Sequence, residues 1–158
     1  TYRRDSLTGL LNHAAFRSDV DLKILEGKLR IMMLMMDVDN FKEYNDTFGH
    51  HNGDQFLILV AQTLLISLKQ EDRACRMGGD EFAAIIFTDE NQLVKIKQDF
   101  ENITREWSEQ NGKTLSVSVG FVKKQEYPEK TVSELAKIAD ARMYQDKEQY
   151  YRENGKIR

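Results

Sequence analysis

The chain has 158 residues, of which 41% are hydrophobic and 31% are charged, and its net charge is −3. This length and composition are typical of one globular domain, so we expect a single domain over residues 1–158. Lys and Arg are spread along the chain without blocks, which argues against polymeric nucleic acid as a partner. The single cysteine, Cys75, excludes an internal disulfide and favours a cytoplasmic location.

The first predicted element is a helix over residues 14–25, where apolar residues recur at helical intervals after Asn12, a residue suited to capping. A strand is predicted over residues 29–36, because this run is apolar without alternation, as in strands buried on both faces. Crossing a bilayer takes about 20 apolar residues, so this run is too short to span a membrane. We therefore expect no direct membrane contact by this domain.

Two acidic residues, Asp37 and Asp39, follow the predicted strand. Buried carboxylates are costly unless they are paired, neutralised or bound to a cation. Two alternatives follow. The strand ends before Asp37 and the carboxylates face water, or they line a site.

Residues 41–54 are predicted to form a loop or short helix with many groups that can bind a polar ligand. Lys42 can neutralise phosphate charge, Asn45 offers an amide donor and acceptor, and Asp54 can accept from paired donors such as a guanine edge. Each also has a local explanation. Asn45 turns the chain, and Asp54 caps the helix predicted over residues 54–68.

Two short β-prone runs, residues 73–77 and 82–87, flank the polar turn Gly78-Gly79-Asp80-Glu81 and predict a hairpin. The two glycines let backbone N–H groups approach a phosphate closely. Asp80 and Glu81 form a second acidic cluster. Carboxylates from two separate elements suit Mg²⁺, which takes one or two of them and completes its shell with water and substrate phosphates.

The remaining chain predicts a helix over residues 91–109, a strand over 114–122 and a helix over 133–151. The whole order is helix, strand, helix, hairpin, helix, strand, helix, which predicts an α/β layer structure. Within it, the split strand-helix-strand arrangement is that of ferredoxin-like sheets. This arrangement would bring the end of the first strand beside the hairpin tip.

Several stretches, in this order, resemble the GGDEF family of diguanylate cyclases from near the start of the chain to its last predicted helix. They are residues 5–12 (DSLTGLLN), 37–42 (DVDNFK), Asn45-Asp46 with Gly49-His50 and Gly53-Asp54, Arg76-Met77 with 78–82 (GGDEF), Ser118-Val119-Gly120, and Ala139-Asp140 with Met143-Tyr144 and Lys147. The resemblance implies a fold akin to polymerase palms and nucleotide cyclases, with a mixed sheet of about five strands flanked by helices. It also implies condensation of two GTP molecules into cyclic di-GMP by a homodimer that holds one GTP per protomer.

The resemblance further implies roles for individual residues. Two Mg²⁺ ions per active site, with Mn²⁺ as an alternative, would be held by Asp37, the backbone oxygen of Val38, and Asp80. The catalytic residues would be Asp80 as the base, Glu81 in support, and Lys42 against the charge of the leaving pyrophosphate. The residues implied in GTP binding are Phe41, Asn45, His50, Asp54, Gly78, Gly79 and Lys147.

Two of the departures from the family pattern bear on function. The product-inhibition motif of the family is Arg-x-x-Asp, and here Lys69 stands in place of the Arg before Asp72. Lys lacks the planar fork with which Arg binds a phosphate or a guanine edge, so we predict weak or absent inhibition by cyclic di-GMP. Tyr151 stands where the family usually has a basic residue, four positions after Lys147.

Three alternatives compete with a cyclase. A degenerate domain would bind GTP and regulate without catalysis, a receptor module would bind cyclic di-GMP at the inhibition site, and an acidic interaction domain would bind no nucleotide. The acidic turn argues against the first and Lys69 against the second. In the cyclase interpretation, residues 1–158 are the output domain of a longer bacterial signalling protein, with a sensor domain N-terminal to them and a tether to a membrane sensor as one arrangement.

Overall fold

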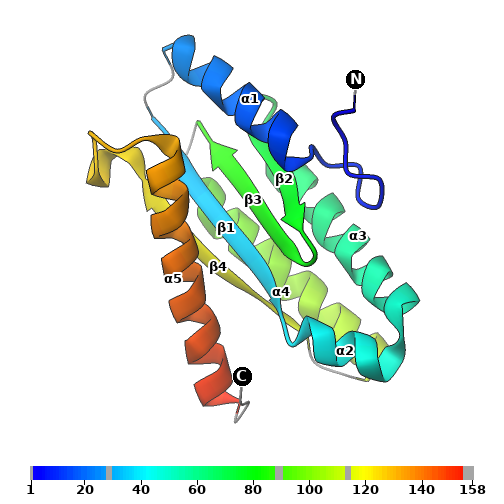
Figure 1. Cartoon of the computed structure of the whole chain (residues 1–158). Helices are drawn as coiled ribbons and strands as arrows, with labels where there is room; N and C mark the ends of the chain where they lie inside the picture. Colours follow the sequence, from blue (N-terminus) through cyan, green and yellow to red (C-terminus); the bar gives the residue numbers. More distant parts are fainter. Residues whose placement is uncertain (1, 28–29, 88–90, 113–114, 155–158) are drawn as a thin grey trace.

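A four-stranded sheet with helices on both faces forms the centre of the computed structural model, which describes residues 2–27, 30–87, 91–112 and 115–154 (Figure 1). The strands are β1 (Met32–Asp39), β2 (Arg73–Gly78), β3 (Glu81–Ile86) and β4 (Ser116–Lys123). The helices are α1 (His13–Leu25), α2 (Phe41–Phe48), α3 (His50–Ser67), α4 (Asn91–Asn111) and α5 (Val132–Glu153), with a short 3-10 helix η1 (Lys124–Glu126).

The strand order is β2-β3-β1-β4, and each neighbouring pair is antiparallel. This order confirms the predicted ferredoxin-like arrangement. The expected mixed sheet of about five strands is wrong in detail, because the described residues form four strands. Their one parallel pairing is an isolated bridge between Leu11 and Cys75. That bridge does not extend into a strand because Asn12 caps α1 immediately afterwards, accepting a hydrogen bond from Ala15 N at 2.9 Å.

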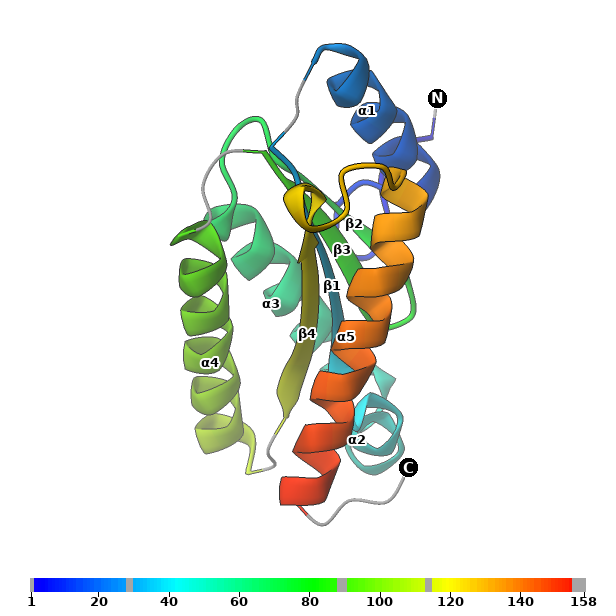
Figure 2. The ribbon, with the colours of Figure 1, turned by 90° about the vertical axis from the view of Figure 1, so that its left-hand side faces the viewer.

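The sheet is buried on both faces, as the uniformly apolar sequence of β1 predicted. Met33 and Met35 lie on the face covered by α1 and α5. Met32, Leu34 and Met36 lie on the face covered by α3 and α4. Figure 2 shows α4 on one side of the sheet and α5 on the other. Alternate residues of one strand therefore contribute to two separate hydrophobic clusters.

Strand β1 continues through both acidic residues. Asp37 pairs with Glu81 of β3 and Ser118 of β4, and Asp39 pairs with Ser116 of β4. The alternative in which the strand ends before Asp37 is therefore wrong. Leu29, the predicted first residue of this strand, lies outside the described residues.

Helix α5 packs closely on β4 and β1. A Cβ atom added to Gly120 would lie 2.1 Å from both the carbonyl oxygen of Ala139 and the backbone nitrogen of Met143. The face of β4 with Ser118 and Gly120 is buried, whereas the more apolar face, with Val119 and its neighbours, is half-buried. The alternating sequence of this strand thus predicts its period but not which face lies deeper.

None of the helices within the described ranges is long and apolar enough to cross a membrane.

Candidate functional site

The end of β1 carries two carboxylates beside a lysine of α5. Asp37 and Asp39 lie on the sheet face that α5 covers, and Nζ of Lys147 is 3.2 Å from Oδ2 of Asp37 and 3.4 Å from Oδ1 of Asp39. The same nitrogen donates to the carbonyl oxygen of Val38 at 3.4 Å. Burial opposes the charge of Lys147, but the carboxylates of Asp37 and Asp39 outweigh it and raise the pKa of the ammonium group.

Both carboxylate oxygens of Asp39 have partners within the protein, so neither is free for a ligand. Its side chain is buried, with Oδ1 accepting a hydrogen bond of 2.6 Å from the Ser118 hydroxyl and Oδ2 accepting from the Ser116 hydroxyl. Burial raises the pKa of Asp39 even though these hydroxyls and Lys147 favour the ionised form. With donors on both oxygens, this carboxylate acts as a structural anchor between β1, β4 and α5.

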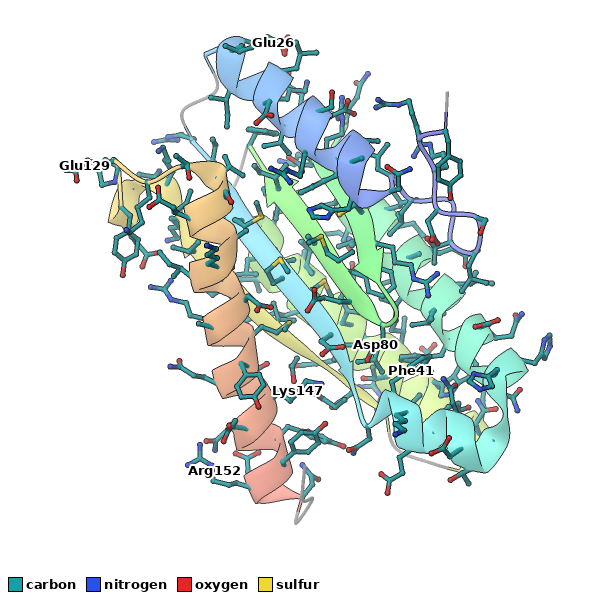
Figure 3. All side chains as sticks on the ribbon, viewed as in Figure 1. Glu26, Phe41, Asp80, Glu129, Lys147 and Arg152 are labelled. Atoms are coloured by element: carbon teal, nitrogen blue, oxygen red, sulfur yellow. The ribbon has the colours of Figure 1, made fainter. Side chains whose placement is uncertain are left out.

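The tip of the β2–β3 hairpin lies against the end of β1, as the predicted topology required. The backbone nitrogen of Val38 donates to the carbonyl oxygen of Asp80 at 3.3 Å. Figure 3 shows Asp80 at the hairpin tip, with Lys147 and Phe41 on neighbouring elements. Burial first, and then the adjacent Asp37 carboxylate, raise the pKa of Asp80 to about 7. Two carboxylates from separate elements thus share one partly buried space.

This space suits a hard divalent cation. Oδ1 of Asp37 is buried and has no hydrogen-bond partner, so one carboxylate oxygen beside Asp80 is left without a donor. Within the described parts of the chain, no group of three or more His, Cys, Asp or Glu side chains is arranged to hold a metal. A cation here would complete its shell from backbone oxygen, water and phosphate, which is the usual pattern for Mg²⁺. The residues present fit such an ion.

Glu81, the next residue after Asp80, lies at the first position of β3, directly opposite Asp37. Burial, and then the charges of Asp140 and Asp37, raise its pKa. Its side chain lines a pocket of about 320 Å³ between α1 and α5, together with Met33 and other residues. Glu81 therefore adds to the negative charge around Asp37 from the α5 side of the sheet.

Helices α2 and α3 carry several of the residues predicted to bind a nucleotide. Lys42 and His50 are exposed, at the starts of α2 and α3 respectively. Phe41 is half-buried, and its ring packs against the hydrophobic core, which anchors the first turn of α2. These three side chains thus differ in role, since only Lys42 and His50 extend into solvent.

Asn45 and Asp54 present acceptor oxygens from adjacent helices. Oδ1 of Asn45 is buried without a partner, and a Cβ added at Gly53 would lie 1.8 Å from it, so α2 and α3 meet closely here. Asp54 is half-buried and is the fifth residue of α3, because that helix begins at His50. The local explanation that Asp54 caps this helix is therefore wrong.

Two residues with no individual role predicted from the sequence hold the glycine turn of the hairpin. Nε of Arg76 donates to the carbonyl oxygen of Gly79 at 2.8 Å, and Gly79 has a left-handed φ of 51°. Nη1 of Arg76 also contacts both oxygens of Asp5, at 3.3 and 3.2 Å. Asp5 in turn accepts from the backbone nitrogen and hydroxyl of Thr8 at 2.9 and 2.8 Å.

Sequence spacing could not reveal this contact, because Asp5 and Arg76 are separated by 71 residues. The signal was their presence in two of the stretches that resemble the GGDEF family. The structure gives these stretches a physical role, which is to fix the shape of the turn that carries Asp80.

The stretch at the product-inhibition position lies at the other end of β2. Oδ1 of Asp72 accepts from the backbone nitrogen of Phe87 at 2.9 Å, and Oδ2 accepts from Nε2 of Gln92 at 2.8 Å and from the backbone nitrogen of Lys69 at 3.0 Å. Asp72 is buried, whereas the Lys69 side chain is exposed. Both residues line a pocket of about 400 Å³ beside Arg73, but the Asp72 carboxylate already accepts hydrogen bonds on both oxygens.

Comparison with known proteins finds one family and many relatives. The family model described as diguanylate cyclase, GGDEF domain, matches residues 2–153. Diguanylate cyclase DgcN of Escherichia coli is 33% identical over 156 residues, which are 94% of this chain and 38% of that protein. The bifunctional diguanylate cyclase/cyclic di-GMP phosphodiesterase MucR of Pseudomonas aeruginosa is 34% identical, over 92% of this chain and 22% of that protein. The chain thus spans well under half of these relatives.

Solved structures agree with the sequence comparison. A microbial GGDEF domain described in its interaction with cyclic di-GMP superimposes with a TM-score of 0.80 at 27% identity, covering 94% of this chain and 95% of that one. The GGDEF domain of DgcB from Caulobacter crescentus, solved in complex with cyclic di-GMP, has a TM-score of 0.75 at 27% identity, covering 100% of this chain and 94% of that one.

Proposed function

Because this chain belongs to the GGDEF family of diguanylate cyclases, we propose that it condenses two GTP molecules into cyclic di-GMP and two pyrophosphates. The observation that carries this proposal is the meeting of Asp37 and Asp80 at one partly buried space, with an open oxygen on Asp37. Such a space binds the cation that accompanies a nucleoside triphosphate.

The metal ions are proposed to be two Mg²⁺ per active site, with Mn²⁺ able to replace them. Asp37, the backbone oxygen of Val38, and Asp80 would hold them, and the unpartnered Oδ1 of Asp37 supports this assignment. When bound, such ions offset the negative charge that develops on the phosphate oxygens.

The reaction forms one bond and breaks another at each phosphorus. The 3′-oxygen of one GTP attacks the α-phosphorus of the other, and the bond from that phosphorus to the pyrophosphate oxygen breaks. Asp80 accepts the proton of the 3′-hydroxyl, because its carboxylate lies beside Asp37 in the space where the nucleotides would meet. Glu81 supports Asp80 through the negative charge that it adds beside Asp37, and Lys42 and Lys147 offset the charge of the triphosphate and the leaving pyrophosphate.

The base is proposed to be guanine. Its N1–H and exocyclic amine are donors, and the unpartnered Oδ1 of Asn45 and the carboxylate of Asp54 are acceptors on adjacent helices. His50 would contribute at the edge of this region, and the backbone N–H groups of Gly78 and Gly79 would bind the phosphates. Because each chain supplies one such set, two copies must face each other for two nucleotides to react.

The proposal extends to the context of the domain. The chain covers only 38% of DgcN, which supports a role as the output domain of a longer signalling protein. In such a protein an upstream sensor domain would control how two copies of this cytoplasmic domain meet.

The test is an incubation of the domain with GTP and Mg²⁺ at several protein concentrations, with products separated by chromatography. We expect cyclic di-GMP and pyrophosphate, with a rate that rises faster than linearly with protein concentration. The Asp80→Asn variant is the control and should lose at least about 100-fold in rate. If GTP binds without release of pyrophosphate at any concentration, the domain is a degenerate GTP-binding regulator and the cyclase proposal is wrong.

A further inference from the structure

Tyr151 lies on α5 one turn after Lys147 and is half-buried beside the end of β1. Its ring centroid is 5.8 Å from Nζ of Lys147, within the range of a cation–π interaction. Its hydroxyl oxygen accepts a hydrogen bond of 3.4 Å from the backbone nitrogen of Asn40. The side chain of Tyr151 therefore contacts both the lysine of the site and the turn between β1 and α2.

The ammonium group of Lys147 has three contacts to oxygen atoms besides the ring of Tyr151. It contacts oxygens of Asp37, Val38 and Asp39 at 3.2 to 3.4 Å, which is at or beyond the long end of the usual hydrogen-bond range. A lysine side chain is a flexible four-carbon stem that costs conformational entropy to immobilise. The aromatic ring of Tyr151 adds a further attractive contact to these three oxygens.

The second contact of Tyr151 reaches a constrained turn. Asn40 has a left-handed φ of 59° and is the only non-glycine residue with a positive φ among those that the structure describes. A non-glycine residue with a left-handed backbone conformation costs free energy, and it persists where surrounding contacts hold it. The turn leads directly into Phe41 and Lys42 of α2, so the hydrogen bond from Asn40 to Tyr151 links the start of that helix to α5.

We propose that Tyr151 is a positioning residue for the cyclase reaction. Its ring holds the ammonium group of Lys147 against the oxygens of Asp37 and Asp39, and its hydroxyl holds the Asn40 turn from which Lys42 projects. Tyr151 thereby sets the places of both lysines that meet the triphosphate. The kinetic consequence rests on the proposed function, whereas the placement of Lys147 does not.

The placement is tested by reductive methylation of lysine amines in the domain without metal or nucleotide, followed residue by residue with mass spectrometry. In the unaltered protein, Lys147 should react more slowly than the exposed Lys137. We expect Tyr151→Leu to raise the rate at Lys147, relative to Lys137, by about five-fold, because the ring contact is lost. Tyr151→Phe keeps the ring and should change this ratio by less than about two-fold.

The matched control is Tyr144→Leu, the same substitution at an exposed position of the same helix, which should leave the ratio unchanged. An unchanged ratio in Tyr151→Leu would overturn the proposal. A circular dichroism melt establishes that each variant is folded. If Tyr151→Leu does not fold, Tyr151→Met, with a longer side chain that can fill the space, takes its place with the same expectation.

Steady-state kinetics test the consequence for the reaction. Tyr151→Leu should raise KM for GTP about five-fold and lower kcat by less than about two-fold, because Lys147 binds the triphosphate before and during the reaction. A loss confined to kcat, with KM unchanged, indicates a purely structural role and overturns the positioning role. If the unaltered domain makes no cyclic di-GMP, the proposed function fails, and the methylation result still decides the placement of Lys147.

Discussion

Asp80 shares a partly buried space with Asp37, and this sets how the metal-free domain responds to pH. Because its pKa rises from 3.8 to about 7 on folding, the folded domain holds a proton on Asp80 that the unfolded chain has lost. The stability contributed by this proton is present at low pH and is lost as pH rises through about 7. We therefore expect the melting temperature of the metal-free domain to fall between about pH 5 and pH 8.

The measurement compares melting curves of the unaltered domain and of Asp80→Asn across this range. The amide does not titrate, so the variant should lose part of the pH dependence, and the rest belongs to groups such as Asp39 and Glu81, whose pKa values are also raised. Carboxylates with lowered pKa values, such as Asp5, lose their proton at lower pH and affect the curves below this window. Identical slopes for both proteins between pH 5 and pH 8 would contradict the assignment to Asp80.

The absence of a side chain at Gly53 leaves the space in which Oδ1 of Asn45 lies. A helical Gly→Ala substitution usually stabilises a protein by about 1 kcal/mol. Here the added methyl group would lie 1.8 Å from Oδ1 of Asn45, so the end of that flexible side chain must rotate away. We expect Gly53→Ala to fold normally and to raise KM for GTP about ten-fold, with a smaller change in kcat.

The control is Gln55→Ala, an exposed position on the same helix, which should leave KM for GTP unchanged. Calorimetric titration with a non-hydrolysable GTP analogue gives an independent measure of affinity. Equal affinity of Gly53→Ala and the unaltered domain for that analogue would show that Asn45 does not read the base.

The tip of the β2–β3 hairpin is tied to the N-terminal segment through Arg76. Arg76 joins Gly79 of the turn to Asp5, and loss of the guanidinium would free the tip that carries Asp80. We expect Arg76→Met to lower kcat at least ten-fold while the domain stays folded, because misplacement of a reacting group by about 1 Å is enough for such a loss. Arg73→Met, on the same strand at the end far from the turn, should reduce kcat much less.

Helix α5 reaches the site because it packs directly on the backbone of β4 at Gly120. An alanine there would bring its Cβ to 2.1 Å from two backbone atoms of α5, which cannot move independently of the helix. We expect Gly120→Ala to cost about 3 kcal/mol and to lower the melting temperature by roughly 10 °C. Gly112→Ala is the control, because its methyl group meets nothing within 4 Å and only its φ of 73° opposes the change. Equal losses in the two variants would show that close packing of α5 is not the cause.

The elements with regular apolar spacing could be predicted from the sequence. The long helix predicted over residues 54–68 and both strands of the hairpin are confirmed, with ends that shift by a few residues. Strand β1 could not be bounded in this way, because Asp37 and Asp39 look like the end of a strand. Their burial depends on Lys147 and on the two serines of β4, which come from distant parts of the chain.

At the scale of the whole molecule, the sequence predicted that the first strand meets the hairpin tip, and the strand order β2-β3-β1-β4 confirms this. What it could not predict is the distribution of partners among the acidic residues. Asp39 looks as available to a metal as Asp37, but hydroxyl groups occupy its oxygens. The contacts that hold the site together, from Arg76 to Asp5 and from Tyr151 to Asn40, join segments whose closeness only the folded chain reveals.

The opposite ends of β2 carry the proposed active site and the stretch that corresponds to the product-inhibition motif. This strand has six residues, so the two regions are about 20 Å apart, and inhibition would have to pass through the sheet. The stretch lines a pocket of about 400 Å³, but the Asp72 carboxylate is not free for a ligand, because Asp72 is 5% exposed and accepts three hydrogen bonds from Phe87, Gln92 and Lys69.

We therefore expect cyclic di-GMP at up to about 100 μM to change the initial rate by less than about two-fold. Substitution of Lys69 by arginine supplies the missing planar fork but leaves the Asp72 carboxylate engaged on both oxygens, so Lys69→Arg alone should not create inhibition. The measurement is the rate of pyrophosphate release as cyclic di-GMP is added to each protein. Inhibition of the unaltered domain at low micromolar product would mean that Asp72 leaves its partners to bind the ligand. Inhibition of the arginine variant alone would locate the defect in Lys69 and not in the burial of Asp72.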